Sequence, residues 1–229
     1  MRILVIADIH SNLEAFKAVL ENVPDYDRAL CVGDVVGYGP RPNECVDEVR
    51  ALGAECVMGN HDYASVTDVA AGFNPYAAYA VHYTHRKLTE ERMRYLEDLP
   101  RSSRFEAEGL RVAVYHGSPR APLDEYVFPD YPSSTLSWFL RQAGADVLVL
   151  GHTHMPMVRR VEGGVVVNPG SVGQPRDGDP RASFMLLDLS GGEVQAEVFR
   201  IRYDIERVAR EMREEGLPPI LYERLFLGW

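Results

Sequence analysis

The alternation of short apolar runs with amphipathic stretches constrains the fold of this chain most strongly. Three apolar runs predict buried strands, at residues 2–7, 28–34 and 54–62. Helical patterns lie between them, at residues 12–23 and 41–52; in the first, Leu13, Phe16 and Val19 recur at helical spacing. This strand–helix–strand–helix–strand series predicts an α/β protein whose first strands form a parallel sheet with right-handed crossovers.

The second half of the chain predicts mainly antiparallel pairing, because its strands are joined by short connections. Glycine pairs at 163–164 and 191–192 are typical of hairpin turns. We expect a helical insertion at about residues 63–100 and a C-terminal helical tail at about residues 204–229. No linker or repeat divides the sequence, so residues 1–229 are predicted to form a single domain.

Composition excludes several classes of protein. The net charge is −10 and no basic patch occurs, which argues against stable nucleic-acid binding. The longest apolar runs fall far short of the roughly 20 residues that span a membrane, and the first run breaks at Asp8, too early for a signal peptide. Three cysteines without metal-site spacing indicate free thiols. A cytoplasmic location is therefore predicted.

Side chains that can bind metal follow the predicted strands at the points where the strands end. They are Asp8, His10, Asp34, Asn60, His61, His116, His152 and His154. Sites in α/β sheets form outside the carboxyl ends of strands, so we expect these side chains to meet there. Five of them have a simpler reading: Asp8 and Asp34 could cap helices or turns, His116 could be a core histidine, and His152 and His154 could be hydrogen-bonded loop residues.

Carboxylate, imidazole and amide oxygen ligands suit Mn²⁺, Fe or Zn²⁺, and the lack of thiolates argues against a structural zinc site. Two metal ions about 3.5–4 Å apart can share a carboxylate and bind both the attacking and the leaving oxygen of a phosphoryl displacement. A nearby imidazole that is not a ligand can protonate the leaving group.

Five short motifs in this chain resemble those of the calcineurin-like metallophosphoesterases. They are D-x-H at 8–10, GD at 33–34, GNHD at 59–62, His116-Gly117 and GHTH at 151–154, and they occur in the family's order over about two thirds of the chain. The GDVVGYGP and NPGS stretches resemble the small prokaryotic phosphodiesterase branch. The resemblance implies a two-layer sandwich of mixed β-sheets flanked by helices.

The resemblance also implies roles for the strand-end residues. Seven would be metal ligands: Asp8, His10 and His154 for one ion, Asn60, His116 and His152 for the second, and Asp34 as the bridge between both. His61 would be the general acid or a phosphate-binding imidazole. The two divalent ions are predicted to be Mn²⁺, with Fe, Zn²⁺, Ni²⁺ or Mg²⁺ as alternatives.

The predicted function is two-metal-dependent hydrolysis of phosphate esters by in-line attack of metal-bound hydroxide, on a small-molecule or nucleotide phosphodiester. A phosphomonoesterase, a phosphoprotein phosphatase and a dinucleoside polyphosphate hydrolase would use the same residues, so the motifs leave these alternatives open. A non-enzymatic scaffold is expected to have lost ligands, whereas all seven are present here.

Substrate-binding residues are predicted close to two of the motifs. Tyr38 follows the bridging aspartate, and Arg176 and Arg181 follow the NPGS loop, where a guanidinium could hold a phosphate. The alternative is that these arginines are solvated or pair with Asp177 and Asp179.

The sequence does not decide the roles of two apolar segments. An aromatic run could line a base-stacking cleft, although its roughly helical spacing is more typical of core residues; its members are Phe73, Tyr76, Tyr79 and Tyr83. The apolar C-terminal stretch LPPILYERLFLGW could pack on the body of the protein or mediate homo-oligomer formation.

Overall fold

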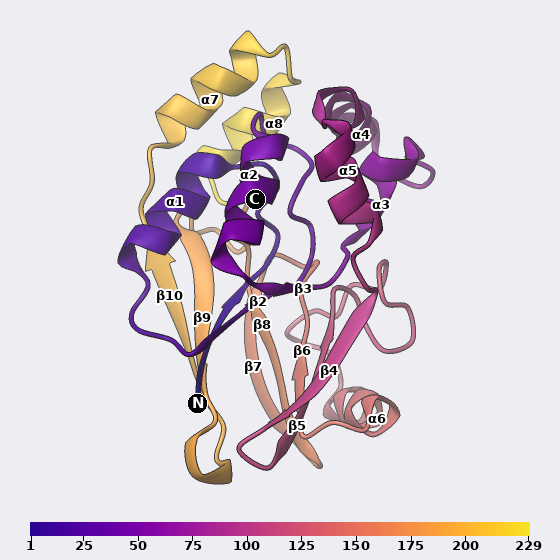
Figure 1. The fold of residues 1–229 in the computed structure, drawn as a ribbon, viewed down its shortest axis with the longest axis vertical. Helices are drawn as coiled ribbons and strands as arrows, with labels where there is room; N and C mark the ends of the chain where they lie inside the picture. The colour runs from indigo at the N-terminus through magenta and orange to yellow at the C-terminus, as the bar shows by residue number, and fades with distance from the viewer.

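Two five-stranded sheets pack face to face in the computed structural model, which describes residues 1–229 (Figure 1). The first sheet has the order β10-β9-β1-β2-β3, in which β1, β2 and β3 are parallel and β9 and β10 are antiparallel to their neighbours. Its strands are β1 (Arg2–Ile6), β2 (Arg28–Cys31), β3 (Glu55–Cys56), β9 (Ala182–Asp188) and β10 (Gln195–Ile201).

The second sheet has the order β4-β5-β6-β8-β7, with parallel β5, β6 and β8 in its centre and antiparallel strands at both edges. Its strands are β4 (Ser102–Ala107), β5 (Leu110–Tyr115), β6 (Val147–Val149), β7 (Pro156–Val161) and β8 (Gly164–Pro169). Both sheets are mixed, which confirms the predicted class. Both predicted glycine hairpins also form, as β7–β8 and β9–β10.

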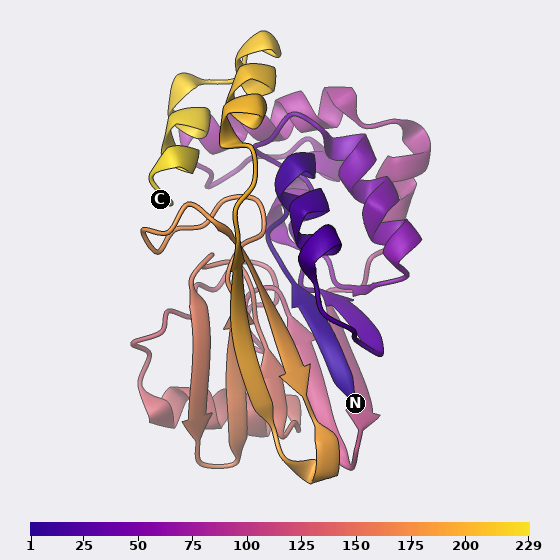
Figure 2. The ribbon, with the colours of Figure 1, turned by 90° about the vertical axis from the view of Figure 1, so that its left-hand side faces the viewer.

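Helices flank the sandwich on both sides and crowd one end of it (Figures 1 and 2). Helices α1 (Leu13–Asn22) and α2 (Pro42–Leu52) cover the first sheet, and α6 (Ser133–Ala143) covers the second. The predicted insertion forms α3 (Asn60–Thr67), α4 (Pro75–Lys87) and α5 (Glu90–Glu97), and the tail forms α7 (Ile205–Glu214), α8 (Pro219–Glu223) and a 3₁₀ turn at Arg224–Phe226.

Three apolar layers hold the sandwich together. The middle layer joins the inner faces of the sheets through residues such as Val5, Leu30 and Val147, all buried. The outer layers lie beneath α1 and α2 and beneath α6, where Phe16 and Phe139 are fully buried. The near-continuous apolar runs of the central strands are explained by this burial on both faces.

The tail packs on the body of the protein. Val208, Met212, Leu221 and Leu225 form one buried cluster with residues of α4 and with Tyr38. This is the first of the two roles that the sequence left open, and self-association through the tail stays a prediction. None of the helices combines the length and the hydropathy that a membrane-spanning helix needs.

Two details of the sequence prediction were wrong. The third strand is only two residues long, because Gly59 is the N-cap of α3 and the chain turns into that helix at Asn60. Strand β4 was not predicted, since its outward-facing Arg104 and Glu106 interrupt any apolar run, as is typical of a half-exposed edge strand.

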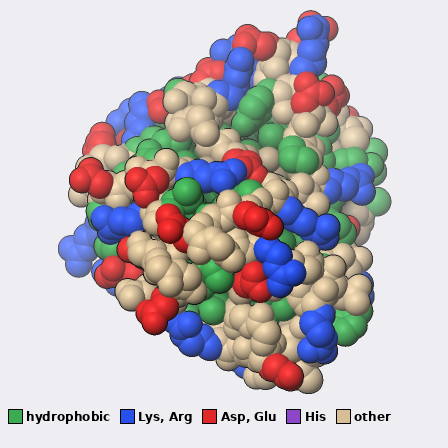
Figure 3. Space-filling view, turned by 60° about the horizontal axis from the view of Figure 1, so that its bottom comes forward, with side chains coloured by type: hydrophobic (Ala, Val, Ile, Leu, Met, Phe, Trp, Pro, Cys, Tyr) green, Lys and Arg blue, Asp and Glu red, His purple; other side chains and the backbone are tan.

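The surface at the sandwich end farthest from the crowded helices carries interspersed acidic and basic side chains (Figure 3). No extended patch of one sign occupies the face in view, and no histidine is visible on it. The histidines of the predicted centre are instead buried inside the molecule.

We predict that Phe184→Ala destabilises the protein by about 3–5 kcal/mol, because Phe184 is fully buried and stacks on Phe199 with ring centroids 5.0 Å apart. Urea unfolding measures the effect. The matched control is Phe226→Ala, since Phe226 is 41% exposed and its loss should cost under about 1 kcal/mol. Equal costs for the two variants would contradict the assigned core.

Candidate metal centre

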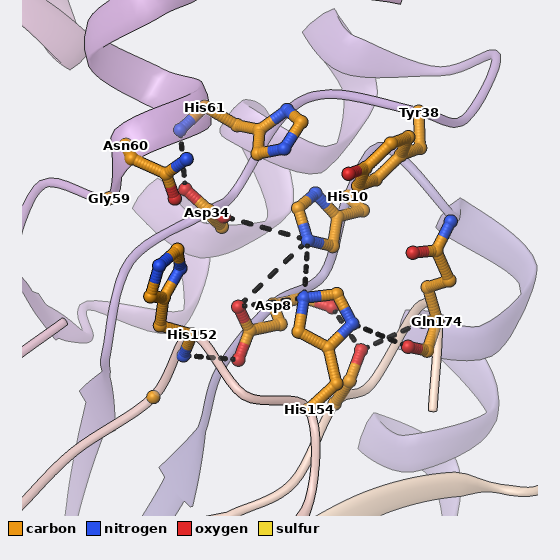
Figure 4. A network of polar contacts seen from close by, with 12 residues as sticks. Asp8, His10, Asp34, Tyr38, Gly59, Asn60, His61, His152, His154 and Gln174 are labelled. Carbon is orange, nitrogen blue, oxygen red and sulfur yellow. Dashed lines mark hydrogen bonds and ion pairs between the residues drawn. The ribbon is translucent and has the colours of Figure 1, made fainter. Parts of the chain in front are cut away.

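Loops from both sheets bring all seven predicted ligands to one place. Figure 4 labels six of them, all except His116. Asp8 and His10 follow β1, Asp34 follows β2, and Asn60 begins α3 just after β3. The other three come from the second sheet: His116 follows β5, and His152 and His154 follow β6. Parallel strands of both sheets end at the same edge, so their following loops converge there.

The first ligand group consists of Asp8, His10, Asp34 and His154. The Nε2 atoms of His10 and His154 are 3.0 Å apart. The His154 Nε2 atom lies 3.3 Å from Asp8 Oδ1, and the His10 Nε2 atom lies 3.6 Å from Asp34 Oδ2. All four side chains are buried, so their donor atoms face one another away from bulk water.

The second group contains Asp34 again, together with His116 and His152. The His116 Nε2 atom lies 3.4 Å from Asp34 Oδ2, 3.2 Å from His152 Nδ1 and 3.1 Å from Asn60 Oδ1. Asp34 Oδ2 is therefore close to one histidine of each group, the position that a bridging carboxylate needs.

Backbone carbonyls fix the orientation of three of the imidazoles. The Nδ1 atoms of His10, His116 and His154 lie 3.1, 2.8 and 2.5 Å from the carbonyl oxygens of Val36, Val32 and Gln174. With Nδ1 as the donor in each case, the neutral ring presents the lone pair of Nε2 to the centre. Hydrogen bonds of this kind set the tautomer of metal-binding histidines.

In each of the two carboxylates, Asp8 and Asp34, one oxygen atom accepts a hydrogen bond and the other has no hydrogen-bond partner. Asp8 Oδ2 accepts a hydrogen bond from the His152 amide at 3.1 Å, and Asp34 Oδ1 accepts one from the His61 amide at 2.8 Å. Asp8 Oδ1 and Asp34 Oδ2 are buried and have no hydrogen-bond partner. Unsatisfied buried carboxylate oxygens are costly, and divalent cations would satisfy them, so these residues fit a metal pair.

Burial and the charges of neighbouring side chains strongly shift the pKa values of the titratable groups in this centre. Burial, together with the neighbouring Asp34, raises the pKa of Asp8 to about 8. For Asp34 itself, burial is outweighed by the positive charge of His116, and its pKa is lowered. The reciprocal attraction of Asp34 outweighs burial at His116 and raises the pKa of that imidazole to about 10. Protons therefore occupy the centre at neutral pH when no cation is bound.

The backbone is strained where the ligands converge. Asp8, His10, Asp34, His152 and His154 all have φ between 50° and 68°, in the left-handed region that non-glycine residues seldom adopt. Strain of this kind gathers at functional sites, where the surrounding structure holds it in place. Here it turns the chain sharply at each strand end, so that two residues of one loop can both face the centre.

Two residues that are not candidate ligands, Asp62 and Gly59, hold the ligand-bearing loops in position. Neither was predicted from the sequence to have this role. Asp62 accepts hydrogen bonds at 3.0 Å from the amides of Val36 and Gly59 and so ties two ligand loops together. A Cβ atom on Gly59 would come within 2.0 Å of Asp34 Oδ1, so only glycine fits there. The sequence indicated Asp62 only through its place at the end of the GNHD motif.

The NPGS loop supports the centre from the other side. The hydroxyl of Ser171 donates to the Asp8 carbonyl at 2.7 Å, and the Asn168 amide donates to the Gly151 carbonyl at 2.7 Å. The loop therefore braces both the D-x-H and the GHTH segments. Its sequence was noted in advance, but its contacts depend on tertiary structure.

His61 and Tyr38 lie beside the ligands without belonging to either group. The ring of His61 is 4.8 Å from that of His10 and 4.4 Å from that of Tyr38. Arg176 reaches the same place, since its Nη2 donates to the Tyr38 hydroxyl at 3.3 Å. Arg181 is not brought to the centre, because its guanidinium pairs with Asp179, as the alternative reading expected.

Comparison with known proteins places the chain in a family. Residues 1–192 match the calcineurin-like phosphoesterase superfamily domain. The crystal structure of a metallophosphoesterase from Sphaerobacter thermophilus superposes with a TM-score of 0.87 at 37% identity and covers 100% of this chain and 99% of that chain. The chain belongs to the calcineurin-like phosphoesterase superfamily.

Two further relatives differ in how much of the chain they match. An uncharacterized protein of Methanocaldococcus jannaschii is 37% identical over 245 residues, which cover 99% of this chain and 98% of that protein. A symmetrical bis(5′-nucleosyl)-tetraphosphatase of Glaesserella parasuis is 36% identical over 67 residues, only 27% of this chain and 25% of that protein.

As a member of this superfamily the protein is a phosphoester hydrolase. A cavity of about 480 Å³ opens beside the centre of this phosphoesterase, and Asn60, His61 and His152 line one part of it. Three aromatic side chains, Tyr38, Phe73 and Tyr126, also line the cavity, beside smaller and polar residues that include Asn74 and Asp124. The Tyr126 ring stacks on that of His152 with centroids 3.8 Å apart.

The four residues of the aromatic run noted in the sequence lie in different surroundings. Phe73 lines the cavity, and its ring lies 4.9 Å from that of His61. Tyr83 is buried beneath the tail, whereas Tyr76 and Tyr79 are about half exposed. The four residues therefore form neither one core face nor one stacking surface.

We predict that Asp34→Asn weakens the stabilisation of this phosphoesterase by Mn²⁺. At 100 times its dissociation constant, a bound ion adds about 2.7 kcal/mol, which corresponds to roughly 5–10 °C in Tm for a chain of this size. Differential scanning calorimetry with and without Mn²⁺ measures the shift for each variant. Asp25→Asn, at an exposed aspartate, is the control and should keep the full shift. A full shift in Asp34→Asn would contradict the bridging position.

Metal binding should release protons, with an affinity that rises with pH. A pH of 7 is lower than the raised pKa values of Asp8 and His116, so both groups are protonated. Metal binding is therefore expected to displace about two protons. At pH 9 Asp8 is already ionised and about one proton remains to be displaced. Calorimetric titration in two buffers of different ionisation enthalpy counts these protons. Binding without proton release at pH 7 would contradict the assigned acidities.

Proposed function

We propose that this protein hydrolyses phosphodiesters with two divalent metal ions, Mn²⁺ in the first instance. The observation that carries the proposal is the position of Asp34 Oδ2, which faces both ligand groups at once. One ion would be held by Asp8, His10 and His154, and the other by Asn60, His116 and His152. When bound, the two ions supply positive charge for phosphate oxygens and lower the pKa of a water molecule for attack on phosphorus.

The protein's own residues bind and orient the ester. Arg176 would hold a non-bridging phosphate oxygen, since it lies beside Tyr38 and carries no carboxylate partner. The cavity lined by Phe73 and Tyr126 gives room for a second ester substituent, which favours a diester over a monoester.

His61 would protonate the leaving oxygen. Its ring lines the cavity beside the centre, where it can contact a bound ester. Burial, with Arg176 and His116, lowers the pKa of His61 to about 4, so the imidazole is neutral at pH 7 before substrate binds. The acid role therefore requires the negative charge of the bound phosphate to raise that pKa.

A dinucleoside polyphosphate hydrolase is the second candidate. Its support is the local similarity to a symmetrical bis(5′-nucleosyl)-tetraphosphatase, which covers 27% of this chain. The same centre would serve that reaction, because an anhydride and an ester present similar phosphate oxygens to the metal ions.

Hydrolysis of bis(p-nitrophenyl) phosphate against p-nitrophenyl phosphate tests the proposal. The protein is stripped of metal and then supplied with Mn²⁺, and release of p-nitrophenolate is followed. We expect Mn²⁺-dependent turnover with the diester preferred. Preference for the monoester would replace the proposal with a phosphatase. Absence of turnover of either ester with any divalent metal would overturn it.

The His61→Ala variant tests the acid role. It should keep its Mn²⁺-induced stabilisation and lose roughly 10²–10⁴-fold in kcat, the range typical of general acids. The loss should be smaller for a p-nitrophenyl ester than for an ester of a simple alcohol, because p-nitrophenolate leaves without protonation. His82→Ala is the matched control, since His82 is exposed and pairs with Asp68. An equal loss for both leaving groups would contradict the acid role.

A further inference from the structure

His152 differs from the other three candidate ligand imidazoles in how its ring is held. In His10, His116 and His154 the Nδ1 atom lies beside a backbone carbonyl and the Nε2 atom faces the centre. In His152 the order is reversed, because its Nδ1 atom faces the centre, 3.2 Å from His116 Nε2. Its Nε2 atom is buried and has no hydrogen-bond partner. The ring of His152 is therefore not oriented by a hydrogen bond from its outer nitrogen.

A ligand imidazole needs a restraint on its ring plane. The torsion about the Cβ–Cγ bond of a histidine has broad minima, so an unrestrained ring can turn about that bond. Turning moves the ligand nitrogen away from the direction in which it contacts an ion. Metal-binding histidines normally avoid this through a hydrogen bond from the second nitrogen. His152 must be restrained in another way.

The ring of Tyr126 packs against the ring of His152. The two centroids are 3.8 Å apart and the planes differ by 23°, so the rings are stacked and nearly parallel. Aromatic rings attract one another in such an arrangement. A turn of the imidazole about its Cβ–Cγ bond would bring its edge into the tyrosine ring, so the stack opposes that rotation.

Tyr126 is held in place although its side chain is 43% exposed. It lies in the loop between β5 and α6, and both of its neighbours in the sequence are anchored. Val127 is buried in the apolar cluster beneath α6, and Glu125 accepts a hydrogen bond from the hydroxyl of the buried Ser118. The loop therefore presents the tyrosine ring to His152 from a fixed position.

We propose that Tyr126 is a positioning residue for the second metal ion, because its ring fixes the plane of His152 and keeps Nδ1 directed at that ion. This inference rests on the proposed two-metal function and deepens it. The first ligand group does not contain His152, and the aromatic rings stacked on Tyr126 are those of His152 and Phe128. Only the second ion should therefore depend on the tyrosine ring.

Titration of the metal-free protein with Mn²⁺ tests this proposal in the absence of substrate. Calorimetry gives the number of ions bound and the affinity of each, and electron paramagnetic resonance distinguishes a coupled pair of Mn²⁺ ions from an isolated ion. We expect the wild-type protein to bind two ions as a coupled pair. Tyr126→Leu keeps an apolar side chain but removes the ring. It should weaken the second ion by about 10–100-fold, as the loss of a ligand's outer partner typically does, and leave the first at its wild-type affinity.

Two further variants separate the ring from other properties of the side chain. Tyr126→Phe keeps the stacked ring and should bind both ions as the wild-type protein does. Tyr76→Leu is the matched control, because Tyr76 is 52% exposed on α4 and outside both ligand groups, and it should bind both ions normally. Thermal melting checks that each metal-free variant is folded, and Tyr126→Gln provides a second ring-free variant if Tyr126→Leu disturbs the loop.

Wild-type affinity for the second ion in the ring-free variants would overturn the positioning role. Equal weakening of both ions would also overturn it, since a general disturbance of the centre has that effect. A loss in Tyr126→Phe as large as in Tyr126→Leu would assign the effect to the hydroxyl instead of the ring. The wild-type titration judges the proposed function separately: one bound ion would contradict the two-metal centre, whereas two ions in every variant would contradict only the role of Tyr126.

Discussion

The sharing of one buried carboxylate between two ligand groups is the constraint on which the rest of this structure depends. Asp34 Oδ2 faces His10 on one side and His116 on the other, and these histidines come from different sheets. The two sheets must therefore pack in one register, with their ligand-bearing strand ends at the same edge. The apolar layer between the sheets fixes that register, and the helices that flank them fix the strands in turn.

A site of this kind destabilises the apo protein. It combines two buried carboxylates, five left-handed ligand residues and several unsatisfied polar atoms within one small volume. Each of these features costs free energy, and the large apolar layers must offset that cost. Bound cations would relieve much of it, because they would neutralise the carboxylates and occupy the lone pairs that face one another. Folding and metal binding would then be coupled through the same atoms.

The sequence predicted which candidate ligands lie together better than it predicted the details of the fold. They could be grouped because strand ends in an α/β sheet converge, so Asp8, Asp34 and His116 were expected at one edge without coordinates. The short β3 and the edge strand β4 were not found, since local pattern carries little information about a two-residue strand or a charged edge. Ligand convergence is a property of topology, whereas strand ends depend on individual backbone contacts.

The residues around the ligands were the hardest to predict. Asp62 and Ser171 act through hydrogen bonds to backbone groups that are distant in sequence, and such partners leave no local pattern. Arg176 and Arg181 look alike in the sequence, but only the first reaches Tyr38, because the second is captured by Asp179. Arg224 lies 48 residues beyond Arg176, yet the guanidinium groups of both lie within 6 Å of the centre of the Tyr38 ring, because the tail packs on α4.

The anomalous scattering of manganese in a crystal of the Mn²⁺-loaded protein tests the two-metal centre most directly. We predict two anomalous peaks about 3.5–4 Å apart, with the Asp34 carboxylate between them. One peak should lie beside His10 and His154, and the other beside His116 and His152. A single peak, or a pair of peaks that Asp34 does not contact, would contradict a binuclear centre bridged by this residue.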